Sequence, residues 1–489
     1  MISRSRLILS RQPTPLEHAR LEPHMRSRFP RVSATVADPS APAYIAGVMI
    51  VESAPLVDAN GSPRMDEIQA RIERRLSRLP QLKRRAHFPG PFQGRPVWVD
   101  DGAFMVDHHI RQGTVDPPGD EKELLAVAER ILRGPLDPTH PPWELWLLTG
   151  LASAHIAILI KLHHAIADGL GAVAIMTTLF DLAPDATDPE PALWTPTPLP
   201  SARALLSDNL AGTFTAFARA LSALRHPRQI ADLATYLRRT VAMSFRAPRT
   251  SFNRPIPSGS SSGVRVLHID LEQARASAHA AGGKINDLVL ALAAGGLREL
   301  LLGRGERVSG ERLYAMVLVT LRSAADAHEL GNQAGFVVIP LPVGEVEAAS
   351  RLRLIAGATR HEKAEQRAAA SQMVGAGSVA SSRITPLIMS HQRMINLVAT
   401  NVPGPSVPFY FLGARIVDAI PLLGGLLGGN VTICFCALSY AGRLNVTVIA
   451  DARTIPDLDR VLRGMRCAWL DLSHLTMPDV TVACDTLAR

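Results

Sequence analysis

The residues best suited to chemistry lie in one short stretch, KLHHAIADGLG (residues 161–171), about a third of the way along the chain. Two adjacent histidines, His163 and His164, and one aspartate, Asp168, interrupt sequence that is apolar on both sides. An imidazole titrates near neutral pH, so it can accept and return a proton during a reaction. The stretch is therefore compatible with acid–base catalysis, a metal site, a nucleotide-binding turn, or a polar turn without chemistry.

A metal site and a nucleotide site both fit the stretch poorly. His164 and Asp168 are four residues apart and would share one face of a helix, but the pattern is typical of a strand end and a turn, with no third ligand nearby. Gly169, Gly171 and Ala174 match the dinucleotide fingerprint in form. That fingerprint places its first glycine directly after the strand, whereas here both histidines intervene. We therefore expect neither a metal nor a dinucleotide.

A purely structural interpretation stays open on spacing alone. The Asp168 carboxylate would cap a following helix, since aspartate is a preferred residue at helix starts. Two histidines at the end of a strand could face solvent or their neighbours. Sequence spacing does not decide between this interpretation and acid–base catalysis.

The flanking sequence predicts the elements that would position this motif. Between residues 44 and 180, strand patterns alternate with amphipathic helices, which favours an α/β layer. The predicted strands are YIAGVMIVE (44–52), RPVWVDD (95–101), PPWELWLLTG (141–150) and AHIAILIKLHH (154–164). The predicted helices are RMDEIQARIERRLSRL (64–79), EKELLAVAERILRG (121–134) and a segment that begins after Asp168.

The middle of the chain has a different composition. Residues 184–200 are dense in proline and predict a linker. Residues 202–249 are helical in character and carry eight arginines against two aspartates. Such a segment is typical of helices on an anionic membrane surface, and also of linker helices packed on a domain. Because the α/β pattern resumes after residue 263, we predict an N-terminal lobe (1–185), a helical connector (186–262) and a C-terminal lobe (263–489).

Composition narrows the function classes. The 489 residues include 52 Lys and Arg against 44 Asp and Glu, a formal net charge of +8, which favours anionic partners. Only 5% of the residues are aromatic and no nucleic-acid-binding signature is present, so we expect no nucleic-acid partner. The apolar run near the N-terminus is too short for a secretory signal. The uncharged window 419–442 is interrupted by glycines and is interpreted as a glycine-rich loop and a buried strand, which predicts a cytoplasmic protein without a membrane span.

The spacing H-H-x-x-x-D-G at a strand-to-helix junction resembles the motif of the CoA-dependent acyltransferase superfamily, which includes chloramphenicol acetyltransferase and peptide-synthetase condensation domains. Further blocks resemble, in order, those of the bacterial wax ester synthase/diacylglycerol acyltransferase family. These are GRPVWVDD (94–101), GPLDPTHPPWELWLLTGL (134–151), INDLVLA (285–291), ELGNQAG (329–335), TNVPGP (400–405) and LSYAGRLNVTVIAD (438–451). The resemblance runs from about residue 15 to residue 458, and the set is far more specific than any one block.

The resemblance implies two chloramphenicol-acetyltransferase-like mixed-sheet lobes with the active site in a tunnel between them. It implies an O-acyltransferase that moves a long-chain fatty acyl group from acyl-CoA to a diacylglycerol, forming triacylglycerol, or to a long-chain alcohol, forming a wax ester. Fatty acyl-CoA would be a co-substrate, with no permanently bound cofactor. The protein would associate peripherally with membranes or lipid inclusions. Two alternatives stay open: acyl transfer to a specialised or polyketide-type hydroxyl, and a non-catalytic paralogue that binds acyl-CoA or lipid.

The resemblance also assigns roles to the motif residues. The family's second motif histidine corresponds to His164, which would be the general base. His163 precedes it on an extended backbone and should point the other way, in a supporting role. Asp168 would hold the loop, and Gly169 would permit its turn. The cysteines Cys434 and Cys436 lie in an apolar strand pattern, where we expect buried free thiols that are poor nucleophiles.

The other blocks supply the predicted substrate-binding residues, which are Asn286, Asp287, Pro141, Trp143 and Asn401. Asn286 lies at the start of a predicted helix. It could therefore cap that helix or form part of the wall of the active site. The proline–tryptophan block and the TNVPGP turn could line the tunnel or act as packing and turn elements. The chain departs from the family pattern in two of these blocks. Pro142 replaces a leucine in the first, and Lys284 precedes Ile-Asn-Asp in the other.

Overall fold

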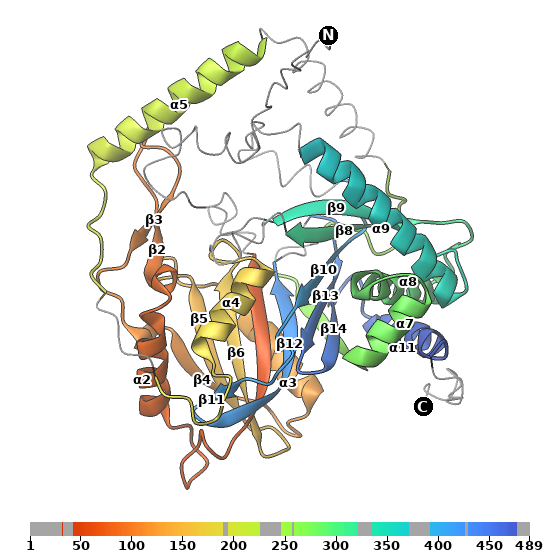
Figure 1. The fold of residues 1–489 in the computed structure, drawn as a ribbon, viewed down its shortest axis with the longest axis horizontal. Helices are drawn as coiled ribbons and strands as arrows, with labels where there is room; N and C mark the ends of the chain where they lie inside the picture. Colours follow the sequence, from red (N-terminus) through yellow and green to blue (C-terminus); the bar gives the residue numbers. More distant parts are fainter. Residues whose placement is uncertain are drawn as a thin grey trace, which may run out of the picture.

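The computed structural model describes residue 32 and residues 43–188, 194–224, 246–256, 259–320, 334–370, 392–425 and 429–476. Most of the first forty residues, the second half of the basic connector and most of the ELGNQAG block lie outside the described residues. Within the described part, the chain forms an α/β fold with two mixed six-stranded sheets, as predicted (Figure 1).

The first sheet has the strand order β11-β12-β1-β6-β5-β4. Its strands are β1 (Tyr44–Glu52), β4 (Ile110–Thr114), β5 (Trp143–Thr149), β6 (His155–His163), β11 (Tyr410–Phe411) and β12 (Ala414–Gly424). Only β4 and β5 are parallel neighbours. A two-stranded sheet of β2 (Arg84–His87) and β3 (Val97–Asp100) lies beside it.

Helices cover both faces of the first sheet. The helices α2 (Met65–Leu76) and α4 (Gly169–Leu179) pack on one face, and α3 (Glu121–Arg133) packs on the other. Alternate residues of a strand point to opposite faces, so a strand covered on both sides must be apolar throughout. This explains the apolar run at residues 156–160 of β6, a strand in which every residue after the first is buried.

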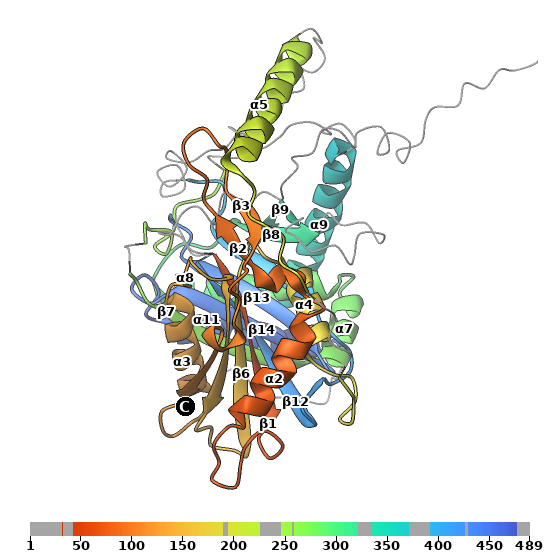
Figure 2. The ribbon, with the colours of Figure 1, turned by 90° about the vertical axis from the view of Figure 1, so that its left-hand side faces the viewer.

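The second sheet has the order β7-β14-β13-β10-β8-β9, in which β10 runs parallel to both β13 and β8. Its strands are β7 (Ser262–Asp270), β8 (Leu313–Thr320), β9 (Ala334–Leu341), β10 (Leu397–Pro403), β13 (Ile433–Tyr440) and β14 (Arg443–Asp451). The helices on its outer side are α7 (Leu271–Ala280), α8 (Ile285–Gly303), α9 (Ala348–Ala370) and α11 (Leu458–Ser473). Figure 2 shows the same arrangement from the side.

Two strands from late in the chain, β11 and β12, belong to the first sheet. The antiparallel register of β12 with β1 runs from Tyr44 opposite Gly424 to Val51 opposite Ile416, so late residues complete the first sheet (Figure 1). The prediction of a glycine-rich loop at PLLGGLLGGN is wrong for its first four residues, which end β12. Pairing with β1 and burial of Leu422 and Leu423 there outweigh the local turn preference of proline and glycine.

The two sheets share one apolar core. It includes Val48 and Leu159 of the first sheet, Cys436 and Ile449 of the second sheet, and Val127 of α3. A shared core of this kind fixes the two lobes relative to each other, because core side chains pack at close to crystalline density. The division of the chain at residues 185 and 262 stays a prediction, with β11 and β12 as late segments that join the first sheet.

The described part of the connector contains one long helix, α5 (Ala202–Leu224), which packs on β3 near its start, through Leu205, and then extends away from both lobes (Figures 1 and 2). Across the described ranges, no helix is both long enough and apolar enough to cross a membrane. Cys434 and Cys436 are buried free thiols, as expected, whereas Cys467 on α11 is disulfide-bonded, which the sequence did not predict.

Candidate active site

The H-H-x-x-x-D-G motif lies where β6 ends and α4 begins. His163 is the last residue of β6, in the middle of the first sheet between β1 and β5. Asp168 is the N-cap of α4, and its Oδ1 accepts a hydrogen bond from the backbone N–H of Gly171 at 2.8 Å. The predicted strand, turn and capped helix are confirmed.

The backbone holds His164 in place. Its backbone N–H donates to the carbonyl of Ala43 at 2.8 Å, which ties the loop to the start of β1. The His164 ring also hydrogen-bonds the backbone of its own residue. A neutral imidazole keeps one unprotonated ring nitrogen, which is the form that a general base requires.

Electrostatics keep both motif histidines neutral at pH 7. Burial lowers the pKa of His164 below its ordinary value of 6.5, while its own backbone and the Asp168 carboxylate oppose part of this effect. Burial, with a smaller effect from His164, lowers the pKa of His163 to about 4. Each ring therefore has one nitrogen that can accept a proton.

His163 is engaged by the loop itself. Its Nδ1 accepts a hydrogen bond from the backbone N–H of Ala165 at 3.2 Å. The ring meets that of Tyr44 edge to face, with centroids 5.7 Å apart, and the side chain is 7% exposed. These contacts stabilise the conformation of the loop.

Sequence reasoning missed two residues that support the motif, Tyr44 and Lys161. The Lys161 ammonium donates to the carbonyls of Ile131 and Gly134 at the end of α3, and it lies 4.4 Å from the centroid of the Tyr44 ring. Burial lowers the pKa of Lys161 to about 8. One feature of the sequence could have predicted these contacts, namely the lysine within the mostly apolar strand HIAILIKLH. A buried charged side chain needs hydrogen-bond partners, because burial without them costs free energy.

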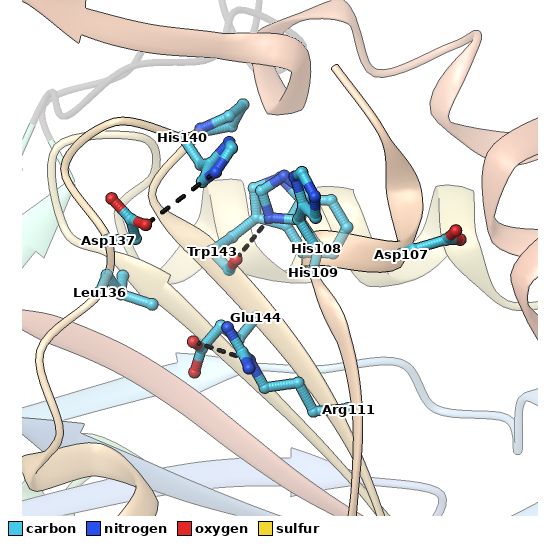
Figure 3. Close-up of a pocket in the computed structure, with 10 residues that line it drawn as sticks. Asp107, His108, His109, Arg111, Leu136, Asp137, His140, Trp143 and Glu144 are labelled. Atoms are coloured by element: carbon cyan, nitrogen blue, oxygen red, sulfur yellow. Dashed lines mark hydrogen bonds and ion pairs between the residues drawn. The ribbon is translucent and has the colours of Figure 1, made fainter. Parts of the chain in front are cut away.

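Pro141 and Trp143 lie beside the motif and line a cavity of about 270 Å³ (Figure 3). The backbone N–H of His163 donates to the Pro142 carbonyl at 3.0 Å, which joins this block to the end of β6. The Trp143 indole N–H donates to the Leu82 carbonyl at 2.7 Å, and its ring stacks on His109 with centroids 4.3 Å apart. Trp143 is thus a fixed wall, with its polar atom satisfied in the core.

Three histidines from outside the motif also line this cavity: His108, His109 and His140 (Figure 3). Nδ1 of His109 donates to the Trp143 carbonyl at 2.9 Å, and burial lowers the pKa of His109 to about 4. These three histidines are not arranged as metal ligands. Among the described residues, no three His, Cys, Asp or Glu side chains are placed to hold a metal ion.

The TNVPGP block approaches the motif from the second sheet. Asn401 and Val402 lie near the end of β10, where they pair with β13. A Cβ atom on Gly169 would lie only 2.6 Å from Cγ2 of Val402. Gly169 is therefore required for this close approach. The backbone of Gly169 is not in the left-handed region, so the predicted reason, the turn itself, is wrong.

The structure also corrects the interpretation of Asn286. The N-cap of α8 is Lys284, not Asn286, and the capping carboxylate is Asp287, whose Oδ2 accepts from the Lys284 backbone N–H at 2.9 Å. The same turn packs on α9, since a Cβ on Gly283 would lie 2.5 Å from Leu352. The described contacts of Asp287 thus belong to helix capping, and they do not bring it to the motif.

Comparison with known proteins identifies the family. Residues 27–289 match the model of the wax ester synthase/diacylglycerol acyltransferase catalytic domain, and residues 330–472 match that of the family's C-terminal domain. A Mycobacterium tuberculosis protein (strain CDC 1551 / Oshkosh), whose name describes it as a diacylglycerol O-acyltransferase, is 30% identical over 89% of this chain and 87% of its own length. Another from the same species (strain ATCC 25618 / H37Rv), tgs2, carries the same description and is 28% identical over 78% of this chain and 84% of its own.

Solved structures agree with the fold. The wax ester synthase/diacylglycerol acyltransferase from Marinobacter aquaeolei VT8 aligns with a TM-score of 0.61 and 22% identity, over 92% of this chain and all of that one. The starter condensation domain of rhizomide synthetase, in complex with C8-CoA, aligns with a TM-score of 0.54 and 15% identity, over 94% of this chain and 96% of its own. The family resemblance seen in the motifs is confirmed. This chain belongs to the wax ester synthase/diacylglycerol acyltransferase family.

Proposed function

We propose that this protein is an acyl-CoA-dependent O-acyltransferase that moves a long-chain fatty acyl group to the hydroxyl of a diacylglycerol, a long-chain alcohol, or both. Family membership supports the reaction class, and the names of the relatives supply the two acceptor classes. The observation that carries the proposal is the buried loop in which His164 directly follows the central strand β6, where burial lowers the pKa of its ring below the ordinary value. The specialised-hydroxyl and non-catalytic alternatives are not favoured by these relatives.

In this reaction, the unprotonated ring nitrogen of His164 takes the proton from the acceptor hydroxyl while that oxygen attacks the thioester carbonyl carbon. A C–O bond forms, the tetrahedral intermediate collapses, the C–S bond breaks, and CoA leaves as a thiolate. The imidazolium returns its proton to the thiolate and becomes neutral again. A positioned base of this kind accelerates a reaction by about 10²- to 10⁴-fold.

No covalent acyl-enzyme is required in this scheme. The free cysteines Cys434 and Cys436 are buried in β13, and burial raises the pKa of the Cys436 thiol well above its ordinary value. A thiol is nucleophilic as its thiolate, so a raised pKa argues against a role for Cys436 in attack on the thioester. Direct attack by the acceptor hydroxyl remains the simpler route.

The remaining motif residues act through His164. His163 and Asp168 are positioning residues, since their described contacts hold the loop and the start of α4. Gly169 lets β10 approach the loop. We assign Pro141, Trp143 and Asn401 to the walls that guide substrate toward His164. Two contacts support this, one between Pro142 and His163 and the other between Val402 and Gly169.

Asn286 and Asp287 keep a proposed substrate-binding role on the resemblance alone. Asp287 has one oxygen in the helix cap, and its Oδ1 is buried without a hydrogen-bond partner among the described residues. A buried carboxylate oxygen without a partner is costly. A hydroxyl or amide of a bound substrate could satisfy it, which is the one structural feature that supports this assignment.

We also propose that the protein works at the surface of membranes or lipid inclusions, where these acceptors dissolve. On α5, large apolar side chains recur every three or four residues along one face and are 38–77% exposed. They are Leu206, Leu210, Phe214, Phe217 and Leu221. Phe92, which is 86% exposed, lies beside them, because the Asn209 side chain donates to its carbonyl at 3.0 Å. An apolar stripe on a basic segment is typical of helices that lie on anionic lipid.

Binding to lipid vesicles tests whether the apolar stripe of α5 contacts the membrane. The variant Phe214→Ser/Phe217→Ser should lose cosedimentation with vesicles that contain phosphatidylglycerol. Val346→Ser is the control, since Val346 is 70% exposed outside α5. Equal binding by wild type and the α5 variant would contradict the assignment.

The reaction itself is tested by chromatographic detection of ester product. Purified protein is incubated with palmitoyl-CoA and diacylglycerol, hexadecanol or no acceptor, beside His164→Ala and His164→Asn. We expect product with at least one acceptor and a loss of about 10²-fold or more in kcat in both variants, with KM nearly unchanged, because a base acts in the transition state. Circular dichroism verifies that the variants fold. Product formation by a folded variant at the wild-type rate would remove His164 as the base.

A further inference from the structure

A second cavity, of about 360 Å³, lies in the C-terminal half of the chain. It is formed where α8 ends, by the turn between β14 and α11 and by the segment that precedes β7. Its lining residues are Ser251, Arg254, Pro255, Arg304, Arg453, Thr454 and Pro456. The volume is at the lower end of the range for sites that bind small molecules.

The cavity lies far from the H-H-x-x-x-D-G motif. Val402 contacts the motif at Gly169 and pairs with Leu438 of β13. Leu438 pairs in turn with Asn445 of β14, so Asn445 marks the level of the motif on β14. The cavity begins just beyond Asp451, at the other end of β14. The strand between Asn445 and Asp451 spans roughly 20 Å. The cavity is therefore separate from the acyl-transfer site.

Arg304 shapes one wall of the cavity. Its guanidinium is ion-paired with Asp457 and donates to Ser251 Oγ at 2.9 Å and to the Thr454 carbonyl at 3.0 Å. The bond from Arg304 holds the pKa of Asp457 below its ordinary range, so this carboxylate is ionised and already satisfied. Arg304 thus ties together the three segments that surround the cavity. A second carboxylate lies at this wall, since Oε2 of Glu306 accepts from the Ser251 backbone N–H at 3.2 Å.

The other two arginines of the cavity, Arg254 and Arg453, do not connect its walls as Arg304 does. Arg254 and Arg453 are exposed at the cavity, and their side chains form no hydrogen bond or ion pair with any residue that the structure describes. The Ser251 hydroxyl oxygen accepts from Arg304, which leaves its hydrogen to donate. The cavity therefore presents two guanidinium groups and one hydroxyl as donors. Of the carboxylates beside it, Asp457 is ion-paired with Arg304, and Asp451 accepts hydrogen bonds from the backbone N–H and hydroxyl of Thr454.

We propose that this cavity binds a phosphoryl group, held by forked hydrogen bonds from Arg254 and Arg453 and by a third hydrogen bond from Ser251. The planar guanidinium matches the geometry of phosphate oxygens and binds them through two parallel hydrogen bonds. The phosphoryl group belongs either to a soluble phosphorylated molecule or to the headgroup of an anionic phospholipid. The chemistry of recognition is the same for both, and the site does not depend on the identity of the acyl acceptor.

Calorimetric titration tests the proposal with adenosine 3′,5′-bisphosphate and inorganic phosphate as probes, beside cosedimentation with phosphatidylglycerol and phosphatidylcholine vesicles. The test variant is Arg254→Gln/Arg453→Gln. The control is Arg78→Gln/Arg95→Gln, which changes the net charge equally at two exposed arginines of the N-terminal half. Both arginines of the cavity are exposed, so the test variant should keep its fold and its ester-forming activity at saturating substrate.

We expect the test variant to bind one probe at least about tenfold more weakly than wild type, since a hydrogen bond to a charged group contributes enough for that factor. The control should bind as wild type does. Loss of bisphosphate binding identifies a soluble ligand, and loss confined to phosphatidylglycerol vesicles identifies a phospholipid headgroup. Wild-type protein that binds none of the probes, or equal affinities in the test and control variants, overturns the proposal.

Discussion

The contact between Gly169 and Val402 joins the catalytic loop to the second sheet, and its energetic role can be predicted. A Cβ at residue 169 would lie 2.6 Å from Val402 Cγ2, whereas carbon atoms attract one another best at about 3.5–4.0 Å. Gly169→Ala must therefore move α4 and β10 apart by about 1 Å, and overpacking of this kind costs about 1–3 kcal/mol. Without the clash, the same change would stabilise the protein by about 0.4–1 kcal/mol through the unfolded state.

Whether Gly169→Ala raises or lowers the free energy of unfolding therefore tests whether the clash occurs. We expect Gly169→Ala to lower the free energy of unfolding in urea by about 1–2 kcal/mol, and to lower kcat because the loop carries His164. The control is Gly357→Ala in α9, where nothing lies within 4 Å of the added Cβ, so this variant should be more stable than wild type.

A double-mutant cycle isolates the contact. Val402→Ala removes the clashing methyl group, so Gly169→Ala/Val402→Ala should recover most of the lost stability and activity, with a coupling free energy of about 1 kcal/mol or more. If Gly169→Ala is as stable as Gly357→Ala, or if the second substitution restores nothing, the close approach does not position the loop. Partial recovery of stability without recovery of kcat would separate the packing of the two segments from the placement of His164.

The remaining predictions concern pH and helix capping. Because burial lowers the pKa of His164, the acid limb of kcat/KM should have its midpoint below pH 6.5; a midpoint above that value would exclude His164 as the titrating base. A 2.6 Å hydrogen bond from His268 to Glu121 joins β7 to α3 and raises the pKa of His268. Its contribution to stability should be complete below pH 6.5 and lost as the pH rises through the raised value, and His268→Gln should abolish this dependence in urea unfolding. Asp168→Ala should cost about 1 kcal/mol of stability through loss of the α4 cap, whereas Asp168→Asn, which keeps an accepting oxygen, should cost clearly less.

Elements with strong local periodicity were predictable from the sequence. The strand predicted at YIAGVMIVE coincides with β1, and the helix predicted at residues 121–134 coincides with α3, whose C-cap is Gly134. In each case one short window contains both the apolar pattern and the residues that end the element. Local pattern was also sufficient for Asp168, because a helix cap is decided within one turn.

Elements that depend on a distant partner were not predictable. The segment that ends β12 contains proline and glycine, and only pairing with β1, more than 360 residues earlier, makes it a strand. The TNVPGP block was predicted as a turn, yet its first four residues extend β10 along β13. Near the N-terminus of α8, capping was one of two roles left open for Asn286, but the N-cap is Lys284, whose backbone N–H donates to the Asp287 carboxylate.

The same distinction separates the chemistry of the site from its placement. The identities and spacing of His163, His164 and Asp168 are local, so the sequence predicted which groups could move a proton. Their positions depend on non-local contacts: Ala43 holds the His164 backbone, the Pro142 carbonyl holds His163, and Val402 packs against Gly169. A chain could keep the motif and still lose activity if any of these contacts failed, because a base misplaced by about 1 Å can cost 10²-fold in rate. The motif therefore predicts the reaction class, whereas we expect the approach of β10 to Gly169 to decide whether His164 is placed for that reaction.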